Sequence, residues 1–474
     1  MWRRQIYSGL AHGVKLINAY RFRDSYDSTD VMDYADADAI GDIPFAGMHL
    51  ETRRTFWELG GFEDVIAAGR PAAESRVALL MCETTDIWAP SEVARQFAKA
   101  GLDKYPRYGT LGAERTSLFL LLQHAQLQTD IVIEEDAVDG WLSQYNVLFL
   151  ADSHVSRAAT KGIVSWVHSG GTLFVGAGGG GYDEYNRTNT AMLQLVGLKA
   201  VRLERDPRGL NGTIDFVKQH LPFARVIDTL VHLNASVDRS KAKEARVDVV
   251  GWKAHFRMSP VNHDVLARWK DGMEAVVRRS VQQGSAIYCG CMVGLAYFRT
   301  AIPKRPVDRG TTDDSFSHFI PPAKAFNVDV RDKLVVGAVF GDNERALAAA
   351  QRPVIASEPL VDAGAIVSPT GIAIPLVNWA GVKRLEGPLL LTLQPSLSEA
   401  HRWKTAQAAT GANVTVLRRE AGEATLLVLG ELDAADAIVL KTDDSETDDV
   451  AVARHDQHRG SSVGRQPALC ARGV

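Results

Sequence analysis

Apolar residues in the middle of the chain occur in short runs separated by longer stretches with helical spacing. Four runs predict buried β-strands: Arg76–Met81, Thr129–Ile133, Tyr145–Leu150 and Gly171–Val175. The stretches Glu114–Gln126 and Ser156–His168 predict amphipathic helices between them. Strands that alternate with helices predict a parallel sheet covered on both faces. We therefore expect an α/β fold class, with a flavodoxin-like parallel sheet domain at its centre.

Beyond residue 200 the pattern changes from alternating strands and helices to strands alone. Asp264–Val277 predicts two strands joined by an Asp-Gly turn, and Gly284–Gly290 predicts another strand. From about Arg331 onward, four runs predict short strands: Ile372–Trp379, Leu389–Leu393, Val414–Leu417 and Ala424–Leu429. Such spacing predicts a small β-sandwich domain. The polar segment from Asp443 to Val474 opens with acidic residues and is expected to be disordered.

The start of the chain predicts a helix followed directly by a strand. Arg3–His12 has apolar residues at helical spacing, and Gly13 is placed to end that helix. Val14–Phe22 is a mostly apolar run of the kind buried in parallel sheets. Phe56–Ala68 predicts a further helix, and the small residues of 69–74 predict a linker. This order is typical of the end of a (β/α)8 barrel, which as a whole needs about 250 residues.

Composition narrows the class of protein. A length of 474 residues suggests three domains at about 150 residues each. A net charge of -4 argues against a nucleic-acid partner, and the apolar runs fall short of the roughly 20 residues of a membrane helix. The cysteines are too few and scattered for a disulfide framework: Cys82, Cys289, Cys291 and Cys470. A reducing, cytoplasmic compartment is the expected location.

Two segments carry a resemblance to a known family. Ser8–Arg23 resembles the last helix and strand of the barrel in family 42 glycoside hydrolases, the β-galactosidases, and Arg54–Phe62 resembles their closing barrel helix. The order of the pieces, through about residue 441, supports the resemblance. It implies four parts: a terminal barrel segment (1–70), a trimerisation domain similar to class I glutamine amidotransferases (74–325), a C-terminal β-sandwich (330–441) and a disordered tail (442–474).

The resemblance implies hydrolysis of terminal β-galactosides or related glycosides with retention of configuration. That reaction uses two carboxylates about 5 Å apart, and both family glutamates come from strands that would precede Met1. No catalytic residue is therefore assigned to this chain. The implied partners are a carbohydrate substrate and, in a homotrimer, further copies of the chain.

Four residues are candidates for contact with substrate. Tyr20, Phe22 and Arg23 lie at the end of the predicted barrel strand, where they could stack on or hydrogen-bond a sugar, although packing explains Tyr20 and Phe22 equally well. Trp88 follows the first strand of the sheet and matches a strand-end tryptophan of the family, which implies a subunit contact toward a neighbouring barrel. The six aspartates between residues 24 and 38 predict a solvated acidic loop.

Other chemistry has weaker support. Gly176–Gly181 satisfies G-x-G-x-x-G, but it follows an interior strand, so a tight turn explains it better than a nucleotide site. The amidotransferase nucleophile would fall at Ala177 or Gly178, which carry no thiol or hydroxyl. We expect no metal site and no cofactor. Three functions remain: a β-galactosidase-like hydrolase lacking its catalytic glutamates, a non-catalytic carbohydrate-binding or assembly protein, and a disfavoured amidotransferase-like hydrolase.

Overall fold

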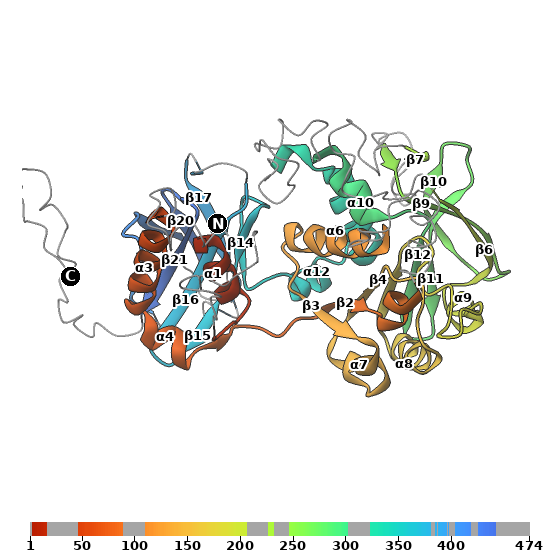
Figure 1. The fold of residues 1–474 in the computed structure, drawn as a ribbon, viewed down its shortest axis with the longest axis horizontal. Helices are drawn as coiled ribbons and strands as arrows, with labels where there is room; N and C mark the ends of the chain where they lie inside the picture. Colours follow the sequence, from red (N-terminus) through yellow and green to blue (C-terminus); the bar gives the residue numbers. More distant parts are fainter. Residues whose placement is uncertain are drawn as a thin grey trace, which may run out of the picture.

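The computed structural model describes residues 2–16, 46–88, 110–205, 226–231, 246–301, 323–380, 384–385, 387–395, 397, 403–418 and 425–441. These residues form two lobes that lie side by side (Figure 1). One lobe is built on a large sheet with helices on both faces, and the other on two smaller sheets with the N-terminal helices against one of them. Within the described residues, no helix is both long and apolar enough to cross a membrane.

The large sheet has the strand order β3-β2-β4-β5-β12-β11-β10-β7-β8. Its strands are β2 (Val77–Met81), β3 (Thr129–Ile133), β4 (Val147–Leu150), β5 (Thr172–Val175), β7 (Asp228–Val231), β8 (Val247–Val249), β10 (Asp264–Trp269), β11 (Glu274–Val281) and β12 (Gly284–Cys289). Neighbouring strands from β3 to β12 pair in parallel, and the remaining strands continue the sheet from β12 with each neighbouring pair antiparallel. The strands expected from sequence are confirmed, but the sheet is mixed, because tight turns between β10 and β11 and between β11 and β12 reverse the chain direction.

Alternate residues of each parallel strand enter two separate cores. Leu79 and Phe149 pack under α6 (Thr110–His124), whereas Leu80 and Leu148 pack under α8 (Arg157–His168). Because both faces of these strands are buried, their sequences are almost entirely apolar. The other helical segments of this lobe are α7 (Glu134–Val138), η2 (Trp141–Gln144), α9 (Thr190–Leu195), α10 (Val293–Phe298), η4 (Arg299–Ala301), η6 (Ala323–Ala325), η7 (Val330–Val336), α11 (Gly337–Phe340) and α12 (Glu344–Ala350), and β6 (Leu198–Arg205) pairs with β9 (Trp252–Met258) as a ribbon.

Two sheets enclose a common core in the second lobe. One sheet contains β1 (Arg70–Pro71), β14 (Val361–Ala363), β15 (Ile366–Ser368), β16 (Gly371–Asn378), β18 (Thr405–Ala408) and β21 (Ala435–Lys441), and the other contains β13 (Val354–Ala356), β17 (Leu389–Leu393), β19 (Val414–Arg418) and β20 (Thr425–Leu429). Ile374 and Leu376 of the first sheet share a core with Leu391 and Leu427 of the second. The four strands expected in this region are confirmed.

The N-terminal helix lies on the second lobe. Helix α1 spans Trp2–Ala11, and the chain leaves it through Gly13, as predicted. Gly13 has a φ of 81°, a conformation that favours glycine, and the following Val14 N–H donates to the Gly9 carbonyl. The apolar face of α1, including Ile6 and Tyr7, packs against Val377 of β16. The two-sheet lobe therefore shares a core with helix α1.

Two expectations about the N-terminal region are wrong. Residues 14–16, the described part of the expected strand Val14–Phe22, form no strand, and Leu16 is 84% exposed. Residues 17–22 lie outside the described residues. The expected helix Phe56–Ala68 is instead two helices, α3 (Ala46–Gly60) and α4 (Glu63–Ala68), because two consecutive glycines interrupt it at Gly60 and Gly61.

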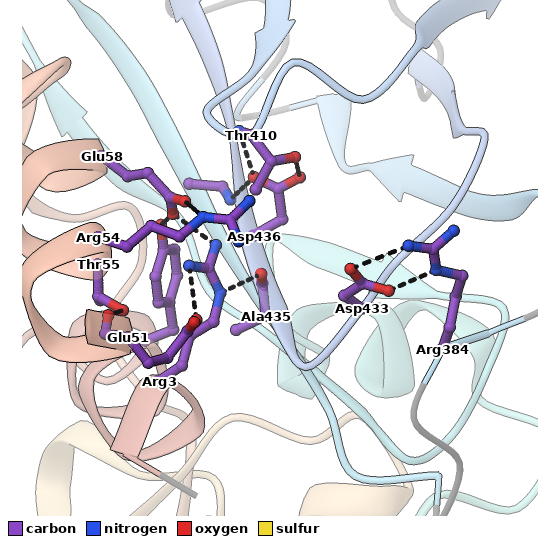
Figure 2. Close-up of polar contacts among 12 residues, drawn as sticks. Arg3, Glu51, Arg54, Thr55, Glu58, Arg384, Thr410, Asp433, Ala435 and Asp436 are labelled. Atoms are coloured by element: carbon purple, nitrogen blue, oxygen red, sulfur yellow. Dashed lines mark hydrogen bonds and ion pairs between the residues drawn. The ribbon is translucent and has the colours of Figure 1, made fainter. Parts of the chain in front are cut away.

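Polar contacts of the buried Arg3 connect α1 to α3 by an ion pair and to β21 by a hydrogen bond (Figure 2). Arg3, only 6% exposed, donates from Nε to the Ala435 carbonyl (2.9 Å) and from Nη2 to Glu58 Oε2 (2.5 Å). Tyr7 also donates to Glu58 (3.1 Å). Since truncating one partner of such a network leaves a buried charge unpaired, the network specifies how α1 sits on the lobe.

Candidate functional site

The strongest candidate site lies at the carboxyl ends of β2 and β4. The chain enters the sheet at β2, and the next two strands add on opposite sides of it, β3 on one and β4 on the other. Ligands of open α/β sheets bind where the strand order reverses in this way, outside the carboxyl ends of the strands. The segments that meet here are Cys82–Trp88 after β2, which is helical from residue 83, and Asp152–His154 after β4.

A buried aspartate organises the floor of this site. Asp152 accepts a hydrogen bond from Cys82 N–H (2.8 Å) and forms an ion pair with Arg115 Nη2 (2.8 Å). Arg115 Nη2 also forms an ion pair with Asp86 (2.8 Å). Burial, only partly offset by Arg115, raises the pKa of Asp152 to about 6. Burial also raises the pKa of the Cys82 thiol, which keeps it protonated and unreactive at neutral pH.

A histidine between two aromatic rings forms the wall beside Asp152. His154 Nδ1 lies 2.9 Å from Ser153 Oγ, and its Nε2 lies 3.0 Å from Asn186 Oδ1. The imidazole stacks on Trp88 at 6.0 Å and on Tyr182 at 5.0 Å between ring centroids. The ring is therefore held by contacts at both of its nitrogens and by two stacked aromatic rings.

Trp88 is the one predicted site residue that lies among the described residues. It lies in the helical segment that begins at residue 83, is half-buried, and donates from Nε1 to the Glu184 carbonyl (3.1 Å). The structure brings it to His154, which the sequence interpretation did not single out. Asp152, Arg115 and His154 were missed, although polar residues directly after the β4 run were a readable signal. The candidates Tyr20, Phe22 and Arg23, and the acidic loop, lie outside the described residues.

The glycine-rich turn after β5 is not arranged to hold a phosphate. Six consecutive N–H groups donate within the protein, those of Gly176, Ala177, Gly178, Gly179, Gly180 and Gly181. A pyrophosphate needs such N–H groups directed at it. At Gly178, where φ is 81°, a Cβ would lie 2.9 Å from Leu203 and 3.2 Å from Trp252. Neither nucleotide binding nor a nucleophile at this turn fits these contacts.

The paired cysteines are enclosed in the core. Cys289 and Cys291 are fully buried, and their sulfur atoms lie 3.4 Å apart. The hydrogen bond with Cys289, together with burial, raises the pKa of the Cys291 thiol. Across the described ranges, no three His, Cys, Asp or Glu side chains converge in a way that could hold a metal ion.

Comparison with known proteins identifies the fold. No family model and no curated protein sequence matches the chain. A β-galactosidase from Bacillus circulans sp. alkalophilus superposes with a TM-score of 0.56 at 12% identity, over 92% of this chain and 51% of that one. The chain therefore shares its fold with about half of that structure. A catalytic mutant of a GH42 β-galactosidase from G. stearothermophilus superposes with a TM-score of 0.51 at 14% identity, over 93% of this chain and 51% of that one. A β-galactosidase from Rahnella sp. R3 superposes with a TM-score of 0.52 at 14% identity, over 90% of this chain and 51% of that one.

This glycoside hydrolase-like fold spans about half the length of each of these solved structures. The match includes both lobes, since more than nine-tenths of the chain is covered in two of the three comparisons. Identities of 12 to 14% show the fold alone.

Proposed function

We propose that this chain is the C-terminal portion of a GH42-type β-galactosidase, which serves the hydrolysis of terminal β-galactosides without supplying the two catalytic glutamates. The observation that carries the proposal is the fold match with a TM-score of 0.56, over 92% of this chain and 51% of a β-galactosidase. In this proposal the carbohydrate is the substrate, the large-sheet lobe serves assembly, and the two-sheet lobe supports the N-terminal helices.

The carboxylates at the candidate site support a non-catalytic role for the large sheet. A retaining glycosidase needs two carboxyl groups about 5 to 5.5 Å apart, both facing the sugar. Asp86 and Asp152 meet at the sheet edge, but both bind Arg115, and Asp152 is completely buried. Because their charges are held in one ion-pair network, these two groups stabilise the loops and leave no pair for acid–base chemistry there.

An exposed apolar surface supports self-association through the same lobe. β3 is the edge strand of the large sheet. Ile131 and Ile133 of this strand, Val138 of α7 and Trp141 of η2 are each at least half exposed. Among the described strands only β2 pairs with β3, and such a strand edge beside exposed apolar side chains is a site of protein association. We assign this surface, defined as the β3 patch, to contacts between copies in a homotrimer.

A non-catalytic carbohydrate-binding or assembly protein is the second candidate function. It is favoured by the filled turn at Gly178, where Leu203 and Trp252 occupy the space of a nucleophile's side chain. The same contacts count against an amidotransferase-like hydrolase.

Hydrolysis of chromogenic glycosides by the purified chain, with its mass measured by light scattering in the same preparation, tests the proposal. We expect a folded trimer with no turnover of the β-galactoside above a vector-only control. Turnover that co-purifies with the chain would show that it does carry catalytic carboxylates. The aspartates between Asp24 and Asp38 would then be the first to be substituted. A folded monomer would contradict the assembly role.

A further inference from the structure

The β3 patch has an acidic border. Residues 129–146 run from β3 through α7 and η2, and they include five carboxylates and no Lys, Arg or His. Three of these carboxylates belong to exposed residues, Asp130, Glu135 and Asp139. The segment that carries the exposed apolar side chains of the β3 patch therefore also carries an excess of negative charge at its surface.

A basic surface lies on the outer side of the ribbon formed by β6 and β9. Val201 and Phe256 belong to the inner side, which packs on the core of the large-sheet lobe. Because successive side chains of a strand point to opposite faces, Arg202 and Arg257 lie on the outer side, and both residues are exposed. Lys199, which precedes Arg202 on β6, is exposed as well. The outer side of the ribbon is therefore positively charged.

These three cations lack a counter-charge in the part of the chain that the structure describes. Glu204 is the carboxylate of the ribbon, and its Oε2 lies 2.9 Å from His255 Nε2. Across the described ranges, no carboxylate forms an ion pair with Lys199, Arg202 or Arg257. Arg202 and Arg257 are diagonal neighbours in the β6–β9 pairing, a separation that long side chains can span, so their like charges repel. An acidic surface on a second molecule would supply the missing counter-charge.

The symmetry of a trimer requires two different surfaces at each interface. A ring of three copies has no twofold axis, so the β3 patch of one copy cannot face the same patch of the next copy. β3 is the edge strand of the large sheet, and Figure 1 shows β6 and β9 on the far side of that lobe from β3. The β6–β9 ribbon is therefore a separate surface of opposite charge, as a head-to-tail ring needs.

We propose that the β3 patch of one copy docks on the β6–β9 ribbon of the next copy. Resting on the trimer of the proposed function, this pairing identifies the surface that the β3 patch contacts. The exposed carboxylates around the patch neutralise the cations of the ribbon, and an arginine of the ribbon stacks on Trp141, which is 60% exposed. Trp and Arg are among the residue types that contribute most binding energy at protein interfaces.

Charge reversal on each surface, with the mass measured by light scattering, tests this pairing on the full chain. Arg202→Glu/Arg257→Glu makes the ribbon acidic, and Glu135→Lys/Asp139→Lys makes the border of the patch basic. Each double variant should lose the trimer mass and become a folded monomer. The chain with all four substitutions should regain the trimer mass, because the two surfaces have then exchanged their charges.

Arg53→Glu/Arg345→Glu is the matched control for the ribbon variant. It changes the net charge equally, at exposed positions of α3 and α12, and should keep the trimer mass. Circular dichroism verifies that each variant is folded, which we expect because every substituted residue is exposed.

Three results would overturn the pairing: a ribbon variant that keeps the trimer mass, a fourfold variant that stays monomeric, or a control variant that dissociates as the ribbon variant does. A wild-type chain that is itself monomeric would contradict the assembly role of the proposed function together with the pairing. A trimeric wild type whose ribbon variant is also trimeric would contradict the pairing alone.

Discussion

At the scale of single residues, Glu114 is a buried carboxylate that connects two helices. It is 1% exposed and accepts from Gly294 N–H (2.9 Å) and Leu295 N–H (2.8 Å), at the start of α10. Burial raises its pKa to about 7, although these two N–H groups oppose the shift. The side chain therefore joins α6 to α10 and is partly protonated near neutral pH.

This pKa predicts an unusual pH dependence of stability. The folded pKa lies above the value of 4.5 for a free glutamate, so unfolding releases a proton, and stability falls as the pH rises from 4.5 to about 7. Over that interval, urea unfolding should show that the wild type loses about 3 kcal/mol more than Glu114→Gln, at about 1.4 kcal/mol per pKa unit. Glu135→Gln, at an exposed position on α7, is the control. Parallel curves for wild type and Glu114→Gln would rule out this role.

At the scale of elements, a glycine is required where two helices pack closely, but not where the helix surface is open. Gly162 lies within α8, and a Cβ there would fall 1.9 Å from the Ala137 carbonyl oxygen of α7. Gly112 lies within α6, where a Cβ would meet nothing within 4 Å. The same substitution should thus have opposite effects in the two helices.

Urea midpoints of the two alanine variants measure this contrast. Gly162→Ala should lower the free energy of unfolding by about 1 to 3 kcal/mol, because α8 must move away from α7. Gly112→Ala should raise it by about 0.5 to 1 kcal/mol, because alanine restricts the unfolded chain and favours the helix. Equal shifts in the two variants would mean that α7 and α8 are not packed as described.

Elements were predictable where local pattern and tertiary burial agree. Strand β4 (Val147–Leu150) falls within the predicted run Tyr145–Leu150 because a strand in a sheet covered on both faces must be apolar, and all four of its residues are buried. Pattern could not reveal that α1 packs on β16, since contacts between the two ends of a chain leave no local periodicity. The ring of His154 escaped notice for the same reason: Trp88, Tyr182 and Asn186 reach it from other loops.

At the scale of the whole molecule, the two lobes together correspond to about half of a GH42-type enzyme, and the β3 patch is where further mass would attach in the proposed assembly. Ile133 is 50% and Trp141 60% exposed, so neither contributes much to the core of the chain itself. Contacts between copies would bury these side chains, and a charge introduced there would lose its hydration without a partner.

The double variant Ile133→Lys/Trp141→Lys should therefore dissociate the trimer into folded monomers. Leu417→Lys is the matched control, because Leu417 is also 60% exposed but lies on β19 of the other lobe. Light scattering gives the mass, and circular dichroism verifies that each variant is folded. A double variant that keeps the wild-type mass would show that the β3 patch is not the interface, whereas loss of mass in Leu417→Lys alone would move the interface to the two-sheet lobe. Because both substituted positions are already half exposed, the fold should tolerate the lysines, which makes mass, not stability, the quantity that decides.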